Sequence, residues 1–157
     1  MEIRGLGLYQ LSPNWQLFSG LGIRNLENDD RGQVTNTGAY AYYRHSKYIY
    51  LPVGVSYQLP TLVPGWKFKS TGEFDINLYS RQYSGIRGGI NNKQKVGYGM
   101  RVALDAKKLG RHHDFLTGIF VRHWSYEDSK VVTVGASRYT EPKNRTFEIG
   151  AKVGFSF

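Results

Sequence analysis

Residues Phe147–Phe157 read FEIGAKVGFSF. Every second residue of this stretch is apolar: Phe147, Ile149, Ala151, Val153, Phe155 and Phe157. The residues between them are charged or small: Glu148, Gly150, Lys152, Gly154 and Ser156. Because successive side chains of a strand point to opposite faces, this period of two predicts a β-strand with one apolar face and one polar face.

The same alternation recurs along most of the chain. We expect strands at Ile3–Leu11, Asn14–Leu26, Tyr43–Leu59, Trp66–Arg81, Lys95–Asp105, Phe115–Ser125 and Thr146–Phe157. The facing of Ile3–Leu11 is ambiguous, and the two patterns within Trp66–Arg81 meet out of phase at Gly72, which predicts a bulge or break there. The chain is therefore predicted to be all-β, with an antiparallel up-and-down arrangement of seven visible strands.

The connections between these strands alternate in length. The short ones are Leu11–Asn14, Pro60–Gly65 and Ala106–His113, and the long polar ones are Asn25–Ala39, Gln82–Gln94 and Glu127–Arg145. Short turns at one end and long loops at the other are typical of a transmembrane β-barrel of the bacterial outer membrane. No apolar run approaches the roughly 20 residues of a spanning helix, which excludes a helical membrane protein.

A soluble sandwich or barrel is the alternative, with its apolar face inward. Against it, the polar face carries acids and bases beside many glycines: Arg24, Arg44, Lys69, Glu73, Asp75, Arg101, Asp105, Arg122, Glu148 and Lys152. Glycine weakens a strand, so a solvated face does not need it, whereas a narrow lumen crossed by paired charges does. The apolar face also has aromatic residues at the short-turn end, where a membrane-interface belt belongs: Trp15, Tyr57, Trp66, Phe115 and Phe157.

The stretch Phe147–Phe157 resembles the C-terminal strand of bacterial outer-membrane proteins, and the chain as a whole is similar to small OmpA/OmpX-like barrels. In that family the final aromatic residue and the alternating apolar residues are recognised by the barrel-insertion machinery. The resemblance implies localisation in the bacterial outer membrane and contact with its lipid and lipopolysaccharide. It implies no particular activity.

Seven strands raise a question of closure. With a periplasmic C-terminus, the first of seven alternating strands would begin outside the cell, whereas bacterial single-chain barrels have an even number of strands. We therefore expect Met1–Phe157 to be a single barrel domain that lacks one or more N-terminal strands, with about eight to ten strands in the full-length protein. The alternatives are direct pairing of the first and last strands, an oligomer that closes the wall, or two strands merged within Asn25–Leu59.

His123 and Ser125 are the sharpest catalytic candidates. Residues two apart on a strand share a face, here near the long-loop end. The pair resembles the outer-membrane lipid A deacylases, which implies that His123 is a general base for the Ser125 hydroxyl, with Glu141 or Glu127 as supporting acid. Tyr126 stands where that family has Asn. Ordinary interfacial residues are the alternative interpretation.

We expect no metal or cofactor. His112 and His113 precede Asp114, but adjacent residues on a strand point to opposite faces and make poor co-ligands, so a turn is favoured. The chain has no cysteine, which excludes disulfides and thiolate metal sites.

The net charge of +9 is compatible with a nucleic-acid partner, with anionic lipid head groups or with simple solubility. Basic residues gather toward the long-loop end: Arg81, Arg87, Lys93, Lys95, Lys130, Arg138, Lys143 and Arg145. They are predicted either to bind lipopolysaccharide phosphates by charge-assisted hydrogen bonds or to be solvated loop residues. Nucleic-acid binding is disfavoured, because these basic residues alternate with apolar residues and form no continuous basic stripe.

These features favour a non-enzymatic outer-membrane barrel that serves envelope integrity or surface interaction. A lipid A deacylase is the first alternative, and a narrow pore is the second. The charges of the polar face argue against an open channel, because side chains fill the interior of a barrel of about eight strands.

Overall fold

The computed structural model describes every residue except 35–37, 39, 62, 87, 95 and 157. Its strands are β1 (Glu2–Gln10), β2 (Trp15–Asp29), β3 (Tyr43–Gln58), β4 (Trp66–Ser84), β5 (Ile90–Gln94), β6 (Gly97–Lys108), β7 (Asp114–Tyr126), β8 (Val132–Val134), β9 (Ser137–Tyr139) and β10 (Asn144–Ser156). The predicted all-β fold is confirmed, and a strand lies in each of the seven expected stretches. Within the described residues, no helix is long and apolar enough to cross a membrane.

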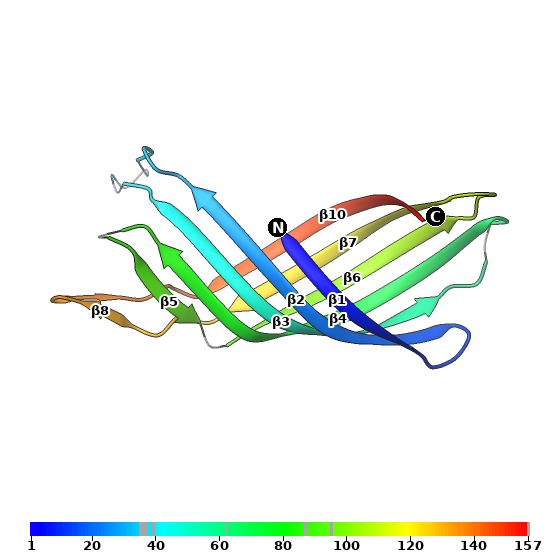
Figure 1. The fold of residues 1–157 in the computed structure, drawn as a ribbon, viewed down its shortest axis with the longest axis horizontal. Helices are drawn as coiled ribbons and strands as arrows, with labels where there is room; N and C mark the ends of the chain where they lie inside the picture. The colour runs from blue at the N-terminus through cyan, green and yellow to red at the C-terminus, as the bar shows by residue number, and fades with distance from the viewer. Residues whose placement is uncertain (35–37, 39, 62, 87, 95, 157) are drawn as a thin grey trace.

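One antiparallel sheet holds the strands in the order β1-β2-β3-β4-β6-β7-β10, so the chain runs up and down along the sheet (Figure 1). Residues 80–84 of β4 pair with β5, while residues 66–76 pair with β6. The strands β5 and β6 therefore lie on the same side of β4, as one interrupted strand. The strands β8 and β9 form a separate hairpin.

The short connections, 11–14, 59–65 and 109–113, lie at one end of the sheet, which we call the turn end. The other end, the loop end, carries 30–42, 85–89 and 127–143. All three stretches expected as long loops contain strand residues: β2 extends to Asp29 within 25–39, β4 and β5 occupy most of 82–94, and β8 and β9 occupy part of 127–145. The segment 82–94 carries polar residues on both faces, so a backbone ladder forms there without the alternation that predicts one.

The strand β4 carries a bulge at Leu78. Consecutive residues of β3 pair with β4 residues on either side of Leu78, which is therefore an extra residue in the ladder. Before the bulge the buried residues are odd-numbered, such as Asp75, and after it they are even-numbered, such as Ser80. The break expected at Gly72 is wrong, because pairing with both neighbouring strands is regular there.

The sheet curls until strands far apart in its order face one another. The strands β3 and β7 are three strands apart, or about 14 Å across a flat sheet. The ring centroids of Tyr48 on β3 and Tyr126 on β7 are nevertheless only 4.4 Å apart. Glu2 of β1 likewise meets Arg122 of β7 at 2.5 Å, across five strand spacings. The polar face of the sheet therefore lines an interior.

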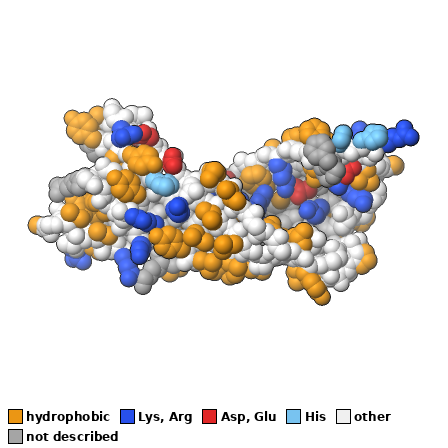
Figure 2. Space-filling model, in the orientation of Figure 1, with side chains coloured by type: hydrophobic (Ala, Val, Ile, Leu, Met, Phe, Trp, Pro, Cys, Tyr) orange, Lys and Arg blue, Asp and Glu red, His pale blue; other side chains and the backbone are white. Residues whose placement is uncertain are grey.

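The apolar face points outward and is exposed. Large apolar side chains on it include Ile3, Leu21, Val53, Phe74, Ile76, Val102, Ile119, Val121, Ile149 and Val153. Figure 2 shows hydrophobic side chains across the middle of the visible face, with Lys, Arg and His side chains to either side. A soluble antiparallel sheet buries its apolar face, so this arrangement is the inverse of a soluble β-protein.

Candidate functional site

Charged side chains from five strands meet in the interior. We call them the interior charge cluster: Glu2, Arg4, Arg24, Glu73, Arg122 and Glu148. Arg122 donates from Nη1 and Nη2 to the two carboxylate oxygens of Glu2, at 2.5 and 3.0 Å. The same Nη1 lies 3.8 Å from Glu148, which also accepts a hydrogen bond from Arg24. One guanidinium therefore connects the edge strands β1 and β10.

The cluster also contains a pair that crosses from β1 to β4. Arg4 Nη2 donates to Glu73 Oε2 at 2.5 Å, and the Glu73 side chain is almost fully buried. Our sequence analysis missed Glu2 and Arg4, because alternation within β1 left the facing of that strand ambiguous. Both residues have even numbers, as do the residues of the polar face of β2 with which they pair. This shared numbering is the signal that could have placed them in the interior.

Aromatic rings close the interior on the loop side of these ion pairs. Tyr48, Tyr50, Trp124 and Tyr126 form one buried cluster, the aromatic plug, in which Tyr50 and Trp124 have no exposed surface. The Trp124 ring lies between Tyr50, at 5.1 Å edge-on, and Tyr126, at 5.8 Å stacked, measured between centroids. The Tyr50 hydroxyl donates to the Glu2 carboxylate. Plug and charge cluster are thus joined into one packed layer.

Glycines on the polar face make room for this layer. A Cβ built on Gly22 would lie 2.2 Å from the Tyr50 ring. A Cβ on Gly99 would meet both Trp124 and the Asp75 carboxylate at less than 3 Å. These positions accept only hydrogen, because the rings of neighbouring strands lie flat over the backbone. The glycines that suggested a crowded interior have this physical cause.

Four of the ten charged residues expected in the interior form no ion pair within the described residues, namely Lys69, which lines the cavity described below, and Arg44, Arg101 and Asp75. Arg44 is exposed at the loop end and contacts the Tyr42 ring and hydroxyl. Arg101 stacks over the Phe120 ring, 4.6 Å from its centroid. Asp75 has no exposed surface, and its carboxylate accepts no hydrogen bond there.

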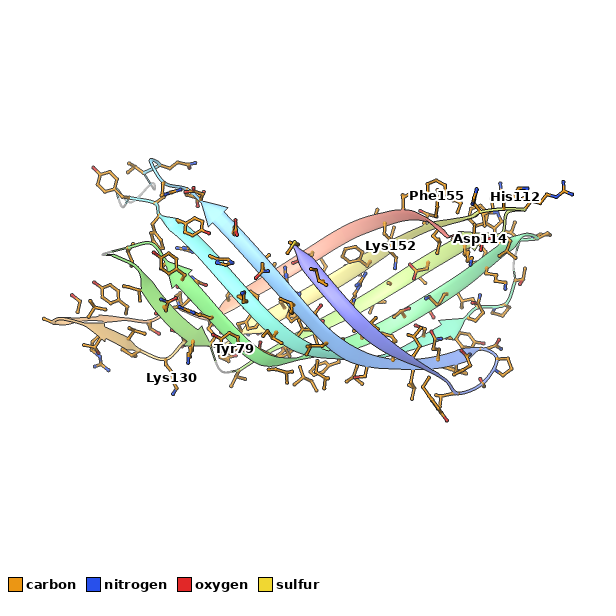
Figure 3. All side chains as sticks on the ribbon, in the orientation of Figure 1. Tyr79, His112, Asp114, Lys130, Lys152 and Phe155 are labelled. Carbon is orange, nitrogen blue, oxygen red and sulfur yellow. The ribbon has the colours of Figure 1, made fainter. Side chains whose placement is uncertain are left out.

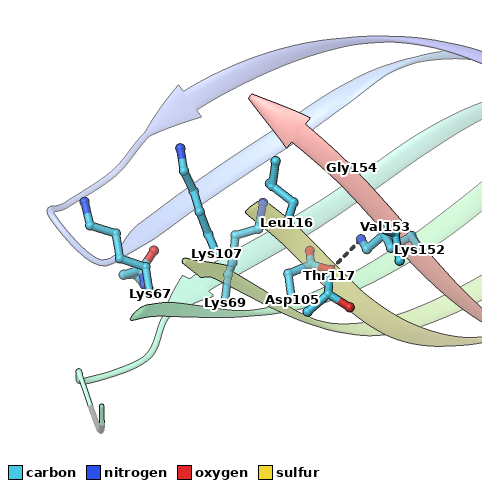
Figure 4. Close-up of a pocket in the computed structure, with 10 residues that line it drawn as sticks. Lys67, Lys69, Asp105, Lys107, Leu116, Thr117, Lys152, Val153 and Gly154 are labelled. Atoms are coloured by element: carbon cyan, nitrogen blue, oxygen red, sulfur yellow. Dashed lines mark ion pairs between the residues drawn. The ribbon is translucent and has the colours of Figure 1, made fainter. Parts of the chain in front are cut away.

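Lys69, Asp105 and Lys152 line a cavity of about 440 Å³ at the turn end of the interior (Figure 4). Lys152 of β10 pairs with Asp105 of β6 at 2.5 Å. This pair crosses over Gly118 of β7, where a Cβ would lie only 2.3 Å from Asp105. Lys67 and Lys107 also line the cavity, and neither was predicted from the sequence as a site residue. Figure 3 shows Lys152 and Asp114 toward the end of the molecule that carries His112.

The aromatic residues expected at the membrane interface lie at the turn end of their strands: Trp15, Tyr57, Trp66 and Phe115. The rings of Trp15 and Tyr57 are 4.6 Å apart across β2 and β3, and those of Phe115 and Phe155 are 5.6 Å apart across β7 and β10. Phe157 lies outside the described residues.

His123 and Ser125 are not joined by a hydrogen bond in the described part of the chain. Ser125 is only 4% exposed, while the His123 ring lies edge-on to Tyr98 at 6.4 Å between centroids. Glu141 interacts through its backbone with Ser129, and both residues belong to the connection 127–143. The deacylase hypothesis stays a prediction, which release of fatty acid from lipid A would test.

Two of the basic residues expected to bind lipopolysaccharide have local partners. Lys143 pairs with Glu127 at 2.7 Å, and Arg81 donates from Nε to the side chain of Asn91 at 2.8 Å. Of the other predicted residues, Lys93, Lys130, Arg138 and Arg145 are exposed. Arg87 and Lys95 lie outside the described residues.

No group of His, Asp and Glu in the described residues is arranged to hold a metal ion. No protein-family model matches the sequence, and no curated protein matches it. The structure is that of an all-β antiparallel sheet compatible with a β-barrel.

Proposed function

We propose that this chain is an integral β-barrel of the bacterial outer membrane with a structural role in the envelope. The observation that carries the proposal is the direction of the two faces. Exposed aliphatic and aromatic side chains cover the outside of a curled sheet, while ion pairs and rings fill the inside. Hydrocarbon is the solvent that accommodates such an outer surface, and a lipid-facing strand shows it every second residue.

Packing of the interior favours a structural role over transport. The aromatic plug and the interior charge cluster lie in contact with each other, on the polar faces of β1, β2, β3, β4, β7 and β10. A small barrel filled by its own side chains stabilises its wall and leaves no aqueous path. The function is therefore that of a rigid membrane element with loops presented on one side.

A charge placed on the outer face tests the proposal. Val102 is 59% exposed at the centre of β6, so in water Val102→Lys would change stability by about 0.5 kcal/mol or less. If the residue faces lipid, the same change costs about 2–4 kcal/mol. The measurement is urea unfolding of the chain inserted in phosphatidylcholine vesicles, followed by tryptophan fluorescence.

Val34→Lys is the matched control, because Val34 is also 59% exposed but lies in the connection between β2 and β3. We expect Val34→Lys to leave the unfolding midpoint within error of the parent chain. Equal small effects of both substitutions would contradict the proposal. So would a parent chain that remains folded and monomeric in water without lipid or detergent.

A further inference from the structure

The cavity at the turn end is built from five elements of the sheet. Its walls include Gln58 of β3, Lys67 and Lys69 of β4, Lys107 of β6, Leu116 of β7 and the β10 segment 152–154. Figure 4 shows the lysines of β4 and β6 close to one another at this end, with Lys152 reaching from β10 to Asp105. A volume of about 440 Å³ lies within the usual range for small-molecule sites, about 300–1,000 Å³.

The charge of the walls is strongly unbalanced. Four lysines and one aspartate line the cavity, which leaves a net charge of +3. Asp114, which lies 2.6 Å from Lys107, lowers this to +2. Neither Lys67 nor Lys69 forms an ion pair within the described residues. The two uncompensated ammonium groups belong to neighbouring positions on the polar face of β4.

The walls also offer apolar surface. Leu116 contributes a half-buried aliphatic side chain, and the methylene stems of the lysines add further apolar area below their ammonium groups. A ligand that fits these walls has a compact dianionic head and a short apolar part.

We propose that this cavity binds a phosphate monoester. At neutral pH a phosphate monoester carries a charge of about −1.5 to −2, which matches the net charge of the walls. Its three oxygens accept charge-assisted hydrogen bonds from Lys67 and Lys69, and its organic group lies against Leu116. The cavity lies at the turn end of the sheet, where the aromatic residues Trp15, Tyr57 and Phe115 also lie. The same chemistry is therefore available from a dissolved phosphate ester and from a lipid headgroup.

The test measures binding of butyl phosphate to the whole chain folded in a neutral maltoside detergent, by isothermal titration calorimetry. We expect saturable binding that Lys67→Gln with Lys69→Gln weakens by roughly tenfold or more, because each lysine loses a charge-assisted hydrogen bond. The matched control is Lys47→Gln with Lys93→Gln, which removes two exposed charges from the loop end. This control should leave the affinity unchanged.

Inorganic phosphate and butanol separate the two parts of the ligand, and each should bind more weakly than butyl phosphate. Nanodiscs of phosphatidylcholine with phosphatidic acid separate the two sources. Loss of butyl phosphate binding in nanodiscs that contain phosphatidic acid, but not in nanodiscs of phosphatidylcholine alone, identifies the lipid headgroup as the natural occupant. Retained binding in both identifies a dissolved ester.

Absence of butyl phosphate binding to the parent chain would overturn the proposal. Equal weakening in both double variants would do so too, because it would indicate attraction to net charge alone. Near-ultraviolet circular dichroism checks that all variants are folded. Because the titration is made in detergent, its outcome does not depend on whether the outer face meets lipid in the cell.

Discussion

At the scale of single residues, the interior is packed from long arginine side chains and from glycines, which have no side chain. Arginines reach across the curled sheet to carboxylates, and glycines leave the space in which rings and ion pairs lie. Arg24 is the clearest case, because its side chain is only 7% exposed and its guanidinium also lies 5.2 Å from the Trp124 ring centroid. Buried charges of this kind are costly to leave without a partner.

Glu148→Ala should destabilise the fold. Glu148 is the carboxylate that pairs with Arg24 and also faces Arg122, so its loss leaves buried positive charge uncompensated. Removing one partner of a buried pair costs about 3–5 kcal/mol, and we expect the lower end because the Glu148 side chain is 30% exposed. Urea unfolding in detergent measures the change.

Glu27→Ala is the control for that substitution. Glu27 lies 3.9 Å from His45, but its side chain is two-thirds exposed at the loop end. An exposed pair contributes about 0.5 kcal/mol or less. If Glu148→Ala were as mild as Glu27→Ala, the interior charge cluster would not stabilise the fold.

Gly118→Val should separate Lys152 from Asp105. A Cβ at Gly118 would lie 2.3 Å from Asp105 Oδ1 and 2.7 Å from the Leu104 carbonyl oxygen, so strand backbone as well as side chain must shift. Overpacking of this kind costs about 1–3 kcal/mol. Gly154→Val on β10 is the matched control, because nothing lies within 4 Å of its Cβ position. In thermal unfolding, the melting temperature of Gly118→Val should be clearly lower than that of Gly154→Val. The reverse order would refute this explanation of Gly118.

At the scale of elements, the bulge in β4 decides which residues enter the interior near the loop end. Each register shift of one residue turns the following side chains to the other face. Beyond Leu78 the strand therefore buries Ser80 and Gln82, while Arg81 points outward. The polar residues buried here form hydrogen bonds across the strands, such as that between Ser46 and Gln82 at 3.2 Å.

Insertion of one alanine between Tyr79 and Ser80 should therefore reverse the facing of the last third of β4. Arg81 would then point inward without a carboxylate partner, and the loss should exceed about 3 kcal/mol. Deletion of Leu78 should be milder, because Asn77 is then followed directly by Tyr79 and regular alternation keeps Ser80 inward and Arg81 outward.

Insertion of one alanine after Gly88, in the connection before β5, is the control and should be tolerated, because surface connections accept changes in length. Folding yield into micelles, followed by circular dichroism, distinguishes the insertions. Similar yields for both would show that the register of β4 does not set the facing.

At the scale of the whole molecule, curling brings the two edges of the sheet to the same guanidinium. Arg122 contacts Glu2 on β1 and lies near Glu148 on β10, although both strands pair on one side only within the described residues. In hydrocarbon, unpaired backbone groups at such edges cost several kcal/mol each. Completion of the wall by further strands, by a partner chain or by direct pairing stays a prediction.

The filled interior predicts that the protein does not conduct ions. In a planar bilayer the parent chain should show no steady current, because the plug leaves Tyr50 and Trp124 without exposed surface. Tyr50→Ala with Trp124→Ala should open a path and raise the current. Leu17→Ala with Ile23→Ala, on the exposed outer face of β2, should not. Steady conductance of the parent chain would contradict the structural role and favour the pore.

The sequence by itself determined the strands, the turn end and the two faces. These features depend on the backbone period of two and on local turn composition, so Phe147–Phe157 or Val96–Leu104 can be interpreted without knowing any partner strand. The same reasoning failed at Gly72, where the apolar residues Trp66, Phe68, Phe74 and Ile76 keep even numbers on both sides and the strand pairing is regular. It also failed within 82–94, because a polar ladder depends on the neighbouring strand and not on alternation. It also left Glu2 and Arg4 unplaced.

Only the tertiary structure decided which charges meet, where the rings gather and where the cavity lies. Arg122 and Glu2 are 120 positions apart in sequence, and Arg24 and Glu148 are 124 apart. Such pairs depend on the stagger and curl of the whole sheet, to which every strand contributes. Lys67 and Lys107 become cavity residues for the same reason, because curling turns the polar faces of β4 and β6 toward β10.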